Sequence, residues 1–162
     1  MSDLAKRVHQ LLRDSDASVA TAESLTGGRL AVALTDVPGA SATYVGGVVT
    51  YATELKVSLL GVEEQVVVTH GVVSAECAKA MATGVRALTG ATYGVATTGV
   101  AGPTEQEGKP PGTVFVGIAG PGMVEVVALE LAGKPQHVQD RTVREALEAL
   151  ASVLRREETP LG

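Results

Sequence analysis

The spacing of hydrophobic residues changes along the chain, and each change predicts a different secondary-structure element. Leu4, Val8 and Leu11 recur at helical spacing near the N-terminus. The next segment, ASVATAES, consists mostly of small and β-branched residues, which favours a buried strand. The chain is therefore predicted to begin with a helix that leads into a strand.

Helices and strands continue to alternate through the rest of the sequence. Further helices are predicted from about residue 27 to Pro38, over TELKVSLLGV, after the N-cap residue Ser74, and in the last segment, where Val143, Leu147, Leu150 and Leu154 share one face. Further strands are predicted over YVGGVVTYA, ATYGVATTGVAG, TVFVGIAG and MVEVVALELAG. Only a few residues separate the last two strands, so they must form an antiparallel hairpin, because a parallel crossover needs a dozen residues or more. We expect an α/β fold with a mixed sheet covered by helices on both faces.

Length and composition narrow the classes of protein that remain. The 162 residues suit a single domain spanning positions 1–162, and the near absence of aromatic residues leaves Val, Leu and Ala to build its core. A net charge of −5 argues against binding to nucleic acids or to anionic membranes, since both require a basic surface. The single Cys77, the charged N-terminus and the lack of a long apolar run predict a soluble cytoplasmic protein.

Hydroxyl and glycine residues gather where predicted strands end. Three places qualify: Glu23 and Ser24 with Thr26, Gly27 and Gly28 at the end of the first strand, Thr50 and Tyr51 after the second, and Thr97, Thr98 and Gly99 at the end of the third. In α/β sheets ligands bind beyond the carboxyl ends of the strands, so these residues are candidates for a site. The paired glycines would let backbone N–H groups approach an anion at a helix N-terminus, although a plain tight turn explains them equally well.

A reactive serine needs a base to accept its proton. Neither the spacing of His9, His70 and His137 nor their surroundings suggests a catalytic histidine or a metal site, and Cys77 is most simply a core residue. Lys56 lies among leucines and valines just after the second strand, where burial would favour its neutral form. The neutral amine could then deprotonate Ser24, with Tyr51 as a proton relay; the alternative is an ordinary solvated lysine.

Six segments together resemble the CinA C-terminal domain family, whose characterised members are nicotinamide-mononucleotide deamidases. They are ESLTGG, DVPGAS, GGVVTYATELKVSLLGV, HGVVS, TTGVAGP and KPPGTV, and they span nearly the whole chain in the family's order. The resemblance implies a three-layer α/β/α fold with a mixed five-stranded sheet that ends in the antiparallel hairpin. It also implies hydrolysis of the carboxamide of nicotinamide mononucleotide to nicotinate mononucleotide and ammonia, in pyridine-nucleotide salvage, without a metal or other cofactor.

The resemblance assigns roles to particular residues. Ser24 would be the nucleophile, Tyr51 and Lys56 its catalytic partners, and Thr98 and Arg141 contacts to the substrate. Thr26, Gly27, Gly28 and Gly99 complete the expected substrate-binding set, with the amides of the two glycines facing either the phosphate or the developing oxyanion. The expected partner is a small-molecule nucleotide, and a homodimer is expected from the resemblance and from base rates.

The sequence departs from the family's pattern at three places. Leu25 replaces a cysteine, the usual glycine run becomes acidic over residues 104–107, and Pro135 stands where an arginine is common. The last two changes bear on substrate identity more than on the fold. Two alternatives therefore stay open: a nucleotide-binding regulatory module of the same fold without turnover, and an amidohydrolase acting on another small amide.

Overall fold

The computed structural model describes residues 2–158, and its elements follow the predicted order. The helices are α1 (Ser2–Asp14), α2 (Arg29–Thr35), the short 3₁₀ helix η1 (Ala40–Ala42), α3 (Thr53–Ser58), α4 (Glu64–His70), α5 (Ala75–Thr89) and α6 (Pro135–Glu158). The strands are β1 (Val19–Glu23), β2 (Tyr44–Val49), β3 (Tyr93–Gly99), β4 (Thr113–Gly120) and β5 (Met123–Glu130).

All five strands form one mixed sheet in the order β2-β1-β3-β4-β5. Strand β1 pairs in parallel with β2 on one side and with β3 on the other, aligning Glu23 with Val49 and with Thr97. Strand β4 runs antiparallel to both β3 and β5, and Gly120 pairs with Met123 at the turn between β4 and β5. The predicted C-terminal antiparallel hairpin is therefore confirmed.

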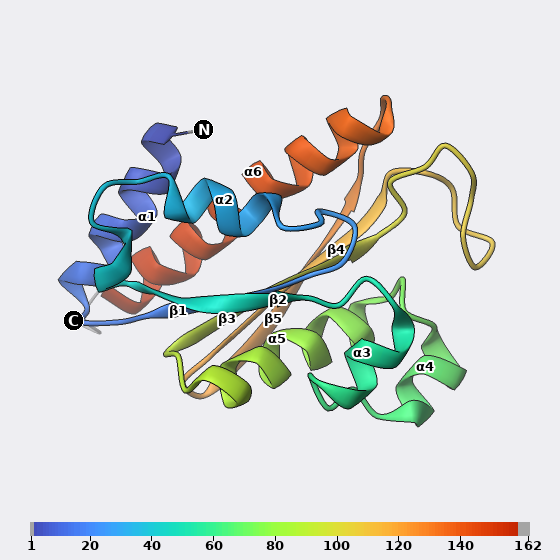
Figure 1. Cartoon of the computed structure of the whole chain (residues 1–162), viewed down its shortest axis with the longest axis horizontal. Coiled ribbons are helices and arrows are strands. Elements are labelled where there is room, and N and C mark those ends of the chain that lie inside the picture. Colours follow the sequence, from blue (N-terminus) through green and yellow to red (C-terminus); the bar gives the residue numbers. More distant parts are fainter. Residues whose placement is uncertain (1, 159–162) are drawn as a thin grey trace.

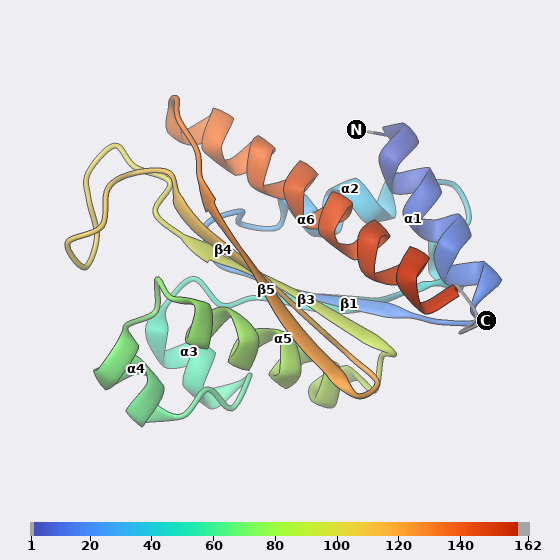
Figure 2. The same ribbon diagram turned by 180° about the vertical axis from the view of Figure 1, so that it is seen from behind.

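Helices cover both faces of the sheet, so the expected three-layer α/β/α arrangement is confirmed. Helices α1, α2 and α6 lie on one face and α3, α4 and α5 on the other (Figures 1 and 2). The larger cluster of buried apolar side chains joins α1, α2 and α6 to the sheet through residues such as Leu12, Leu30 and Leu147. A second cluster, centred on Met81 and Val85 of α5, fills the other side. No helix among residues 2–158 is both long and apolar enough to span a bilayer.

Helix α5 lies unusually close to the sheet. A Cβ atom added to Gly117 of β4 would come within 2.3 Å of the carbonyl oxygen of Ala78, and one added to Gly94 of β3 within 2.3 Å of that of Ala82. Ser74 begins this helix as predicted, its hydroxyl accepting a hydrogen bond from the Cys77 amide. The absence of side chains at the two glycines is therefore what permits the approach of helix and strand.

The structure differs from the sequence expectation mainly over residues 62–70. The sequence predicts no element there, yet Glu64–His70 forms α4. Its run of valines is typical of a strand, so packing of the helix against α5 prevails over local preference. The predicted strand in YVGGVVTYA also ends earlier, at Val49, because Thr50 and Tyr51 turn away to lead into α3.

Candidate active site

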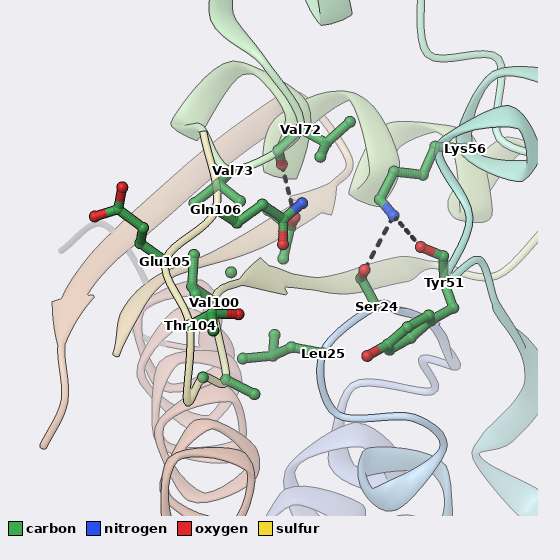
Figure 3. A pocket seen from close by; sticks show the side chains of 14 residues that line it. Ser24, Leu25, Tyr51, Lys56, Val72, Val73, Val100, Thr104, Glu105 and Gln106 are labelled. Carbon is green, nitrogen blue, oxygen red and sulfur yellow. Dashed lines mark hydrogen bonds between the residues drawn. The ribbon is translucent and has the colours of Figure 1, made fainter. Parts of the chain in front are cut away.

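Ser24 lies at the point where the strand order reverses. It follows the last residue of β1. The chain goes from β1 to β2 on one side and then crosses to β3 on the other side, which leaves a crevice beyond the carboxyl ends of β1 and β3. The backbone N–H of Ser24 donates to the carbonyl of Thr97 on β3 at 3.1 Å. The serine is thus fixed at the sheet edge by the neighbouring strand, with its side chain directed into the crevice (Figure 3).

Lys56 approaches Ser24 from the first turns of α3. Its side chain is only 1% exposed, and its Nζ lies 3.0 Å from the Ser24 Oγ. The same nitrogen lies 2.6 Å from the carbonyl oxygen of Thr50 and 3.3 Å from that of Tyr51. The amine is therefore surrounded by two backbone acceptors and one hydroxyl, and no carboxylate among residues 2–158 is in contact with it.

This environment favours the neutral amine over the ammonium. Burial lowers the pKa of Lys56, while Cys77 and the charges of Glu107 and Glu54 oppose the shift only in part. A neutral amine has two N–H donors and one lone pair. The carbonyls of Thr50 and Tyr51 can accept both N–H groups, which leaves the lone pair to accept the proton of Ser24.

Glu23, which precedes the serine, occupies the N-terminal end of α2. Its buried carboxylate accepts hydrogen bonds from the amides of Gly28, Leu30 and Ala31 at 2.8–3.2 Å, and from the Thr26 hydroxyl at 2.7 Å. The helix end that the sequence suggested for an anion is therefore filled by the protein's own carboxylate.

The turn after Ser24 leaves two other amides without an acceptor. The Gly27 N–H donates to the Ser24 carbonyl at 3.1 Å, but no acceptor among residues 2–158 faces the N–H groups of Leu25 and Thr26. These two amides directly follow the serine, which is where an oxyanion hole is built in serine hydrolases that use the nucleophile's own turn.

A cavity of about 380 Å³ opens in front of Ser24 and Lys56. Its walls come from the turn before α5, the end of β3 and the loop that leads to β4, and they include Val72, Val73, Thr98, Gly99, Thr104 and Gln106. Thr98 is buried, and its hydroxyl donates to the Val72 carbonyl at 2.7 Å, which leaves oxygen lone pairs available to a ligand. Lys56 is the one basic side chain in this lining, within the part of the chain that the structure describes.

Tyr51 contributes both its backbone and its side chain. The carbonyl holds Lys56, and the side chain lines the cavity while remaining 71% exposed. In Figure 3 the ring lies beside Ser24 at the edge of the crevice. An exposed ring at the entrance can contact the substrate directly.

The other residues expected from the sequence are placed differently. Thr26 is buried and bonds to Glu23 and Thr97, so its side chain shapes the turn. Gly27 and Gly28 border a separate depression on the outer side of α2. Arg141 lies outside the cavity lining and pairs with Glu145 at 3.4 Å on α6, because its position on the helix faces away from the buried side.

Sequence reasoning missed two carboxylates that organise the site. Glu23 stood in the motif but received no role, although a buried acid directly before a glycine turn and a helix is a recognisable capping signal. Glu107 was read only as a charge in the loop. None of the three histidines lines the cavity, and among residues 2–158 no three His, Cys, Asp or Glu side chains are grouped to hold a metal ion.

Fold and site together define an α/β/α protein with a serine–lysine pair at the strand-order switch point. The chain belongs to the CinA C-terminal domain family, because the family's model matches residues 1–154. A CinA-like protein from Frankia casuarinae is 51% identical over 144 residues, covering 89% of this chain and 33% of the relative. The chain spans about a third of the length of such relatives.

Solved structures agree with this assignment. A CinA superfamily protein from Klebsiella pneumoniae shares 36% identity with a TM-score of 0.93, covering 96% of this chain and 98% of that one. A CinA superfamily protein from Escherichia coli shares 33% identity with a TM-score of 0.92, covering 94% of this chain and 89% of that one. These likenesses confirm the fold, while the names specify no reaction.

Proposed function

We propose that this chain is an amidohydrolase that converts nicotinamide mononucleotide to nicotinate mononucleotide and ammonia. The observation that carries the proposal is the contact between a buried lysine, held by two carbonyls, and the hydroxyl of Ser24. The resemblance in the sequence supplies the substrate, and the geometry supplies a route for the reaction.

The reaction begins with proton transfer from Ser24 to the neutral Lys56. The Ser24 Oγ attacks the carboxamide carbon, and the oxygen that becomes negative is stabilised by the unpaired amides of Leu25 and Thr26. The carbon–nitrogen bond then breaks, and Lys56, directly or through the Tyr51 phenol, returns the proton to the departing ammonia. Lys56 then deprotonates a water molecule that attacks the acyl carbon, the bond from this carbon to the Ser24 Oγ breaks, and Lys56 returns the proton to the Oγ as the carboxylate product leaves.

The arrangement also proposes an orientation for the substrate. With the α2 end occupied by Glu23, the carboxamide takes the free amides near Ser24, and Thr98 and Gly99 contact the nicotinamide end. The phosphate then lies toward the cavity mouth, beside the loop of residues 101–106. In this orientation Arg141, Gly27 and Gly28 do not contact the substrate.

The decisive experiment measures ammonia release from nicotinamide mononucleotide in the presence of a chelator. We expect turnover by the wild type and a loss of roughly 10³-fold or more in Ser24→Ala, because no other group can take over the acyl transfer. Ser58→Ala removes an exposed serine at the end of α3 and should keep wild-type activity. Saturable binding of the mononucleotide without ammonia would instead indicate the regulatory module.

One observation favours a second candidate substrate. Among the described residues Lys56 is the one basic side chain that lines the cavity, and its environment favours the neutral amine, so the pocket also suits an amide that carries no phosphate. Nicotinamide riboside should therefore be tested beside the mononucleotide. A higher kcat/KM for the riboside would replace the nucleotide proposal with a related small amide.

A further inference from the structure

The loop that roofs the cavity is tied to the turn before α5 by a carboxylate outside the cavity. Both oxygens of Glu107 accept backbone hydrogen bonds, from Val72 at 3.0 Å and from Val73 at 2.9 Å. No other acceptor within the described chain serves these two amides. Lys109 donates from the same loop to the Val73 carbonyl. We call this set of contacts, made by Glu107 and Lys109 with residues 72–73, the loop clamp.

The loop clamp acts on residues that form the cavity wall. Val72 and Val73 line the cavity, and the Val72 carbonyl is fixed from the other side by the hydroxyl of Thr98 (Figure 3). All four backbone polar groups of Val72 and Val73 are thus held by Glu107, Lys109 and Thr98. Charge-assisted bonds of this kind are shorter and stronger than neutral ones, so they define the position of the wall.

The sequence accommodates this carboxylate at a specific glycine. A Cβ atom on Gly71 would lie 2.5 Å from the Glu107 carboxylate oxygen, and the backbone there has a φ of 79°. Gly71 therefore leaves the space through which Glu107 reaches the two amides. Glu105, only two residues earlier, also lines the cavity, but among residues 2–158 it makes no hydrogen bond, and in Figure 3 its carboxylate points away from Ser24 and Lys56.

We infer that Glu107 is a positioning residue that sets substrate affinity by holding the 72–73 wall against the cavity. It touches neither Ser24 nor Lys56, which are held by β1, β2 and α3. Loss of the clamp should therefore weaken binding while leaving the chemical step intact. The acidic loop is then an organising element of the pocket, in contrast to the repulsion of phosphate that its charge alone would suggest.

The test compares Glu107→Gln with Glu105→Gln, which removes the same charge from the same loop without breaking a hydrogen bond. Hydrogen exchange of the Val72 and Val73 backbone amides, followed by NMR in the full chain, should accelerate about tenfold in Glu107→Gln. The reason is that the NH₂ group of the new side chain would face one of these two N–H donors, which it cannot accept. Glu105→Gln should leave both exchange rates unchanged. Lys109→Met removes the other arm of the clamp and should accelerate exchange of Val73 in particular.

Kinetics provide the second readout, and this part rests on the proposed function. KM for nicotinamide mononucleotide should rise roughly tenfold in Glu107→Gln, because the cavity wall is no longer held in place. Loss of the Glu107 charge also lowers the pKa of Lys56, so kcat is compared at a pH where Lys56 is neutral in both proteins and should there stay within about twofold of wild type. Glu105→Gln should not raise KM. Unchanged exchange in Glu107→Gln, or equal effects of both variants, would overturn the inference. An inactive wild type would refute the proposed function alone, because the exchange comparison still decides the clamp.

Discussion

In the proposed reaction Lys56 acts as a neutral base, although lysine side chains are usually charged. Its ammonium form would be buried beside two carbonyls and a hydroxyl with no carboxylate in contact, so burial lowers its pKa. Burying a lysine side chain costs free energy, and buried lysines with a lowered pKa are found at functional sites, where the neutral amine takes part in the chemistry. The lysine's surroundings are therefore better explained by catalysis than by stability.

The state of this amine predicts how activity depends on pH. Below the pKa of Lys56 the lone pair is protonated and cannot accept the Ser24 proton, so kcat/KM should fall about tenfold per pH unit as the pH decreases. Because the pKa is lowered from 10.5, the midpoint of this limb should lie below that value. The profile of kcat/KM from pH 6 to 10 measures it.

Lys56→Arg is the informative control, since a guanidinium stays charged throughout this range. It should be inactive at every pH that the wild type tolerates. A wild-type profile that rises toward acid would contradict the neutral-amine base.

At the scale of single residues, the sequence suggested the reactive groups but not their contacts. Ser24 and Lys56 could be proposed from their neighbours and from the resemblance in motifs. The contacts of the Lys56 amine with the carbonyls of Thr50 and Tyr51 could not be predicted from the sequence, because the orientation of this backbone depends on how β2 ends.

Helix α2 shows how one buried side chain can determine the start of an element. The helix has only seven residues, and its N-cap Gly28 has a φ of 104° and no side chain to cap the helix. Glu23 supplies that function from the preceding strand. The turn that carries Ser24 is therefore enclosed between the carboxylate of Glu23 and the helix that it caps.

Substitution of Glu23 by Gln should destabilise the fold. One oxygen is replaced by a donor that faces the amide of Ala31 or Leu30, leaving buried groups unsatisfied, and we expect a loss of about 1–3 kcal/mol in urea unfolding. Glu64→Gln changes an exposed carboxylate in the first turn of α4 and should cost at most a few tenths of a kcal/mol. Equal stability of Glu23→Gln and wild type would refute the capping role.

Elements with a clear period or a cap residue were predicted well from the sequence. Helix α5 begins at Ser74 as expected, and β4 and β5 form the hairpin that their short connection required. Helix α4 was not predicted, because its valines favour a strand locally, whereas the folded chain packs the segment as a helix against α5. Tertiary packing of this kind leaves no local signal.

At the scale of the whole molecule, the spacing between α5 and the sheet depends on glycines. Gly117→Ala would bring a methyl group within 2.3 Å of the backbone carbonyl of Ala78, and a helix backbone can yield only by moving as a unit. We expect a loss of about 1–3 kcal/mol, measured as the shift in the urea midpoint at constant m.

Gly120→Ala is the matched substitution on the same strand. Its new methyl group would meet the Tyr93 ring at 2.6 Å, and a side chain can shift more easily than a backbone. It should therefore destabilise less than Gly117→Ala. The reverse order would show that the close approach of α5 does not limit stability.

The two halves of the sheet differ in how their contacts arise along the chain. The β4–β5 hairpin forms between neighbours in sequence, whereas β1 pairs with β3 across more than sixty intervening residues. Ser24, Lys56 and Thr98 meet only through the long-range parallel pairing of β1 with β2 and β3. A partly folded chain that has formed only the β4–β5 hairpin therefore contains no site. Enzymatic activity regained during refolding would measure only the fraction of molecules in which the slow, long-range strand pairing is complete.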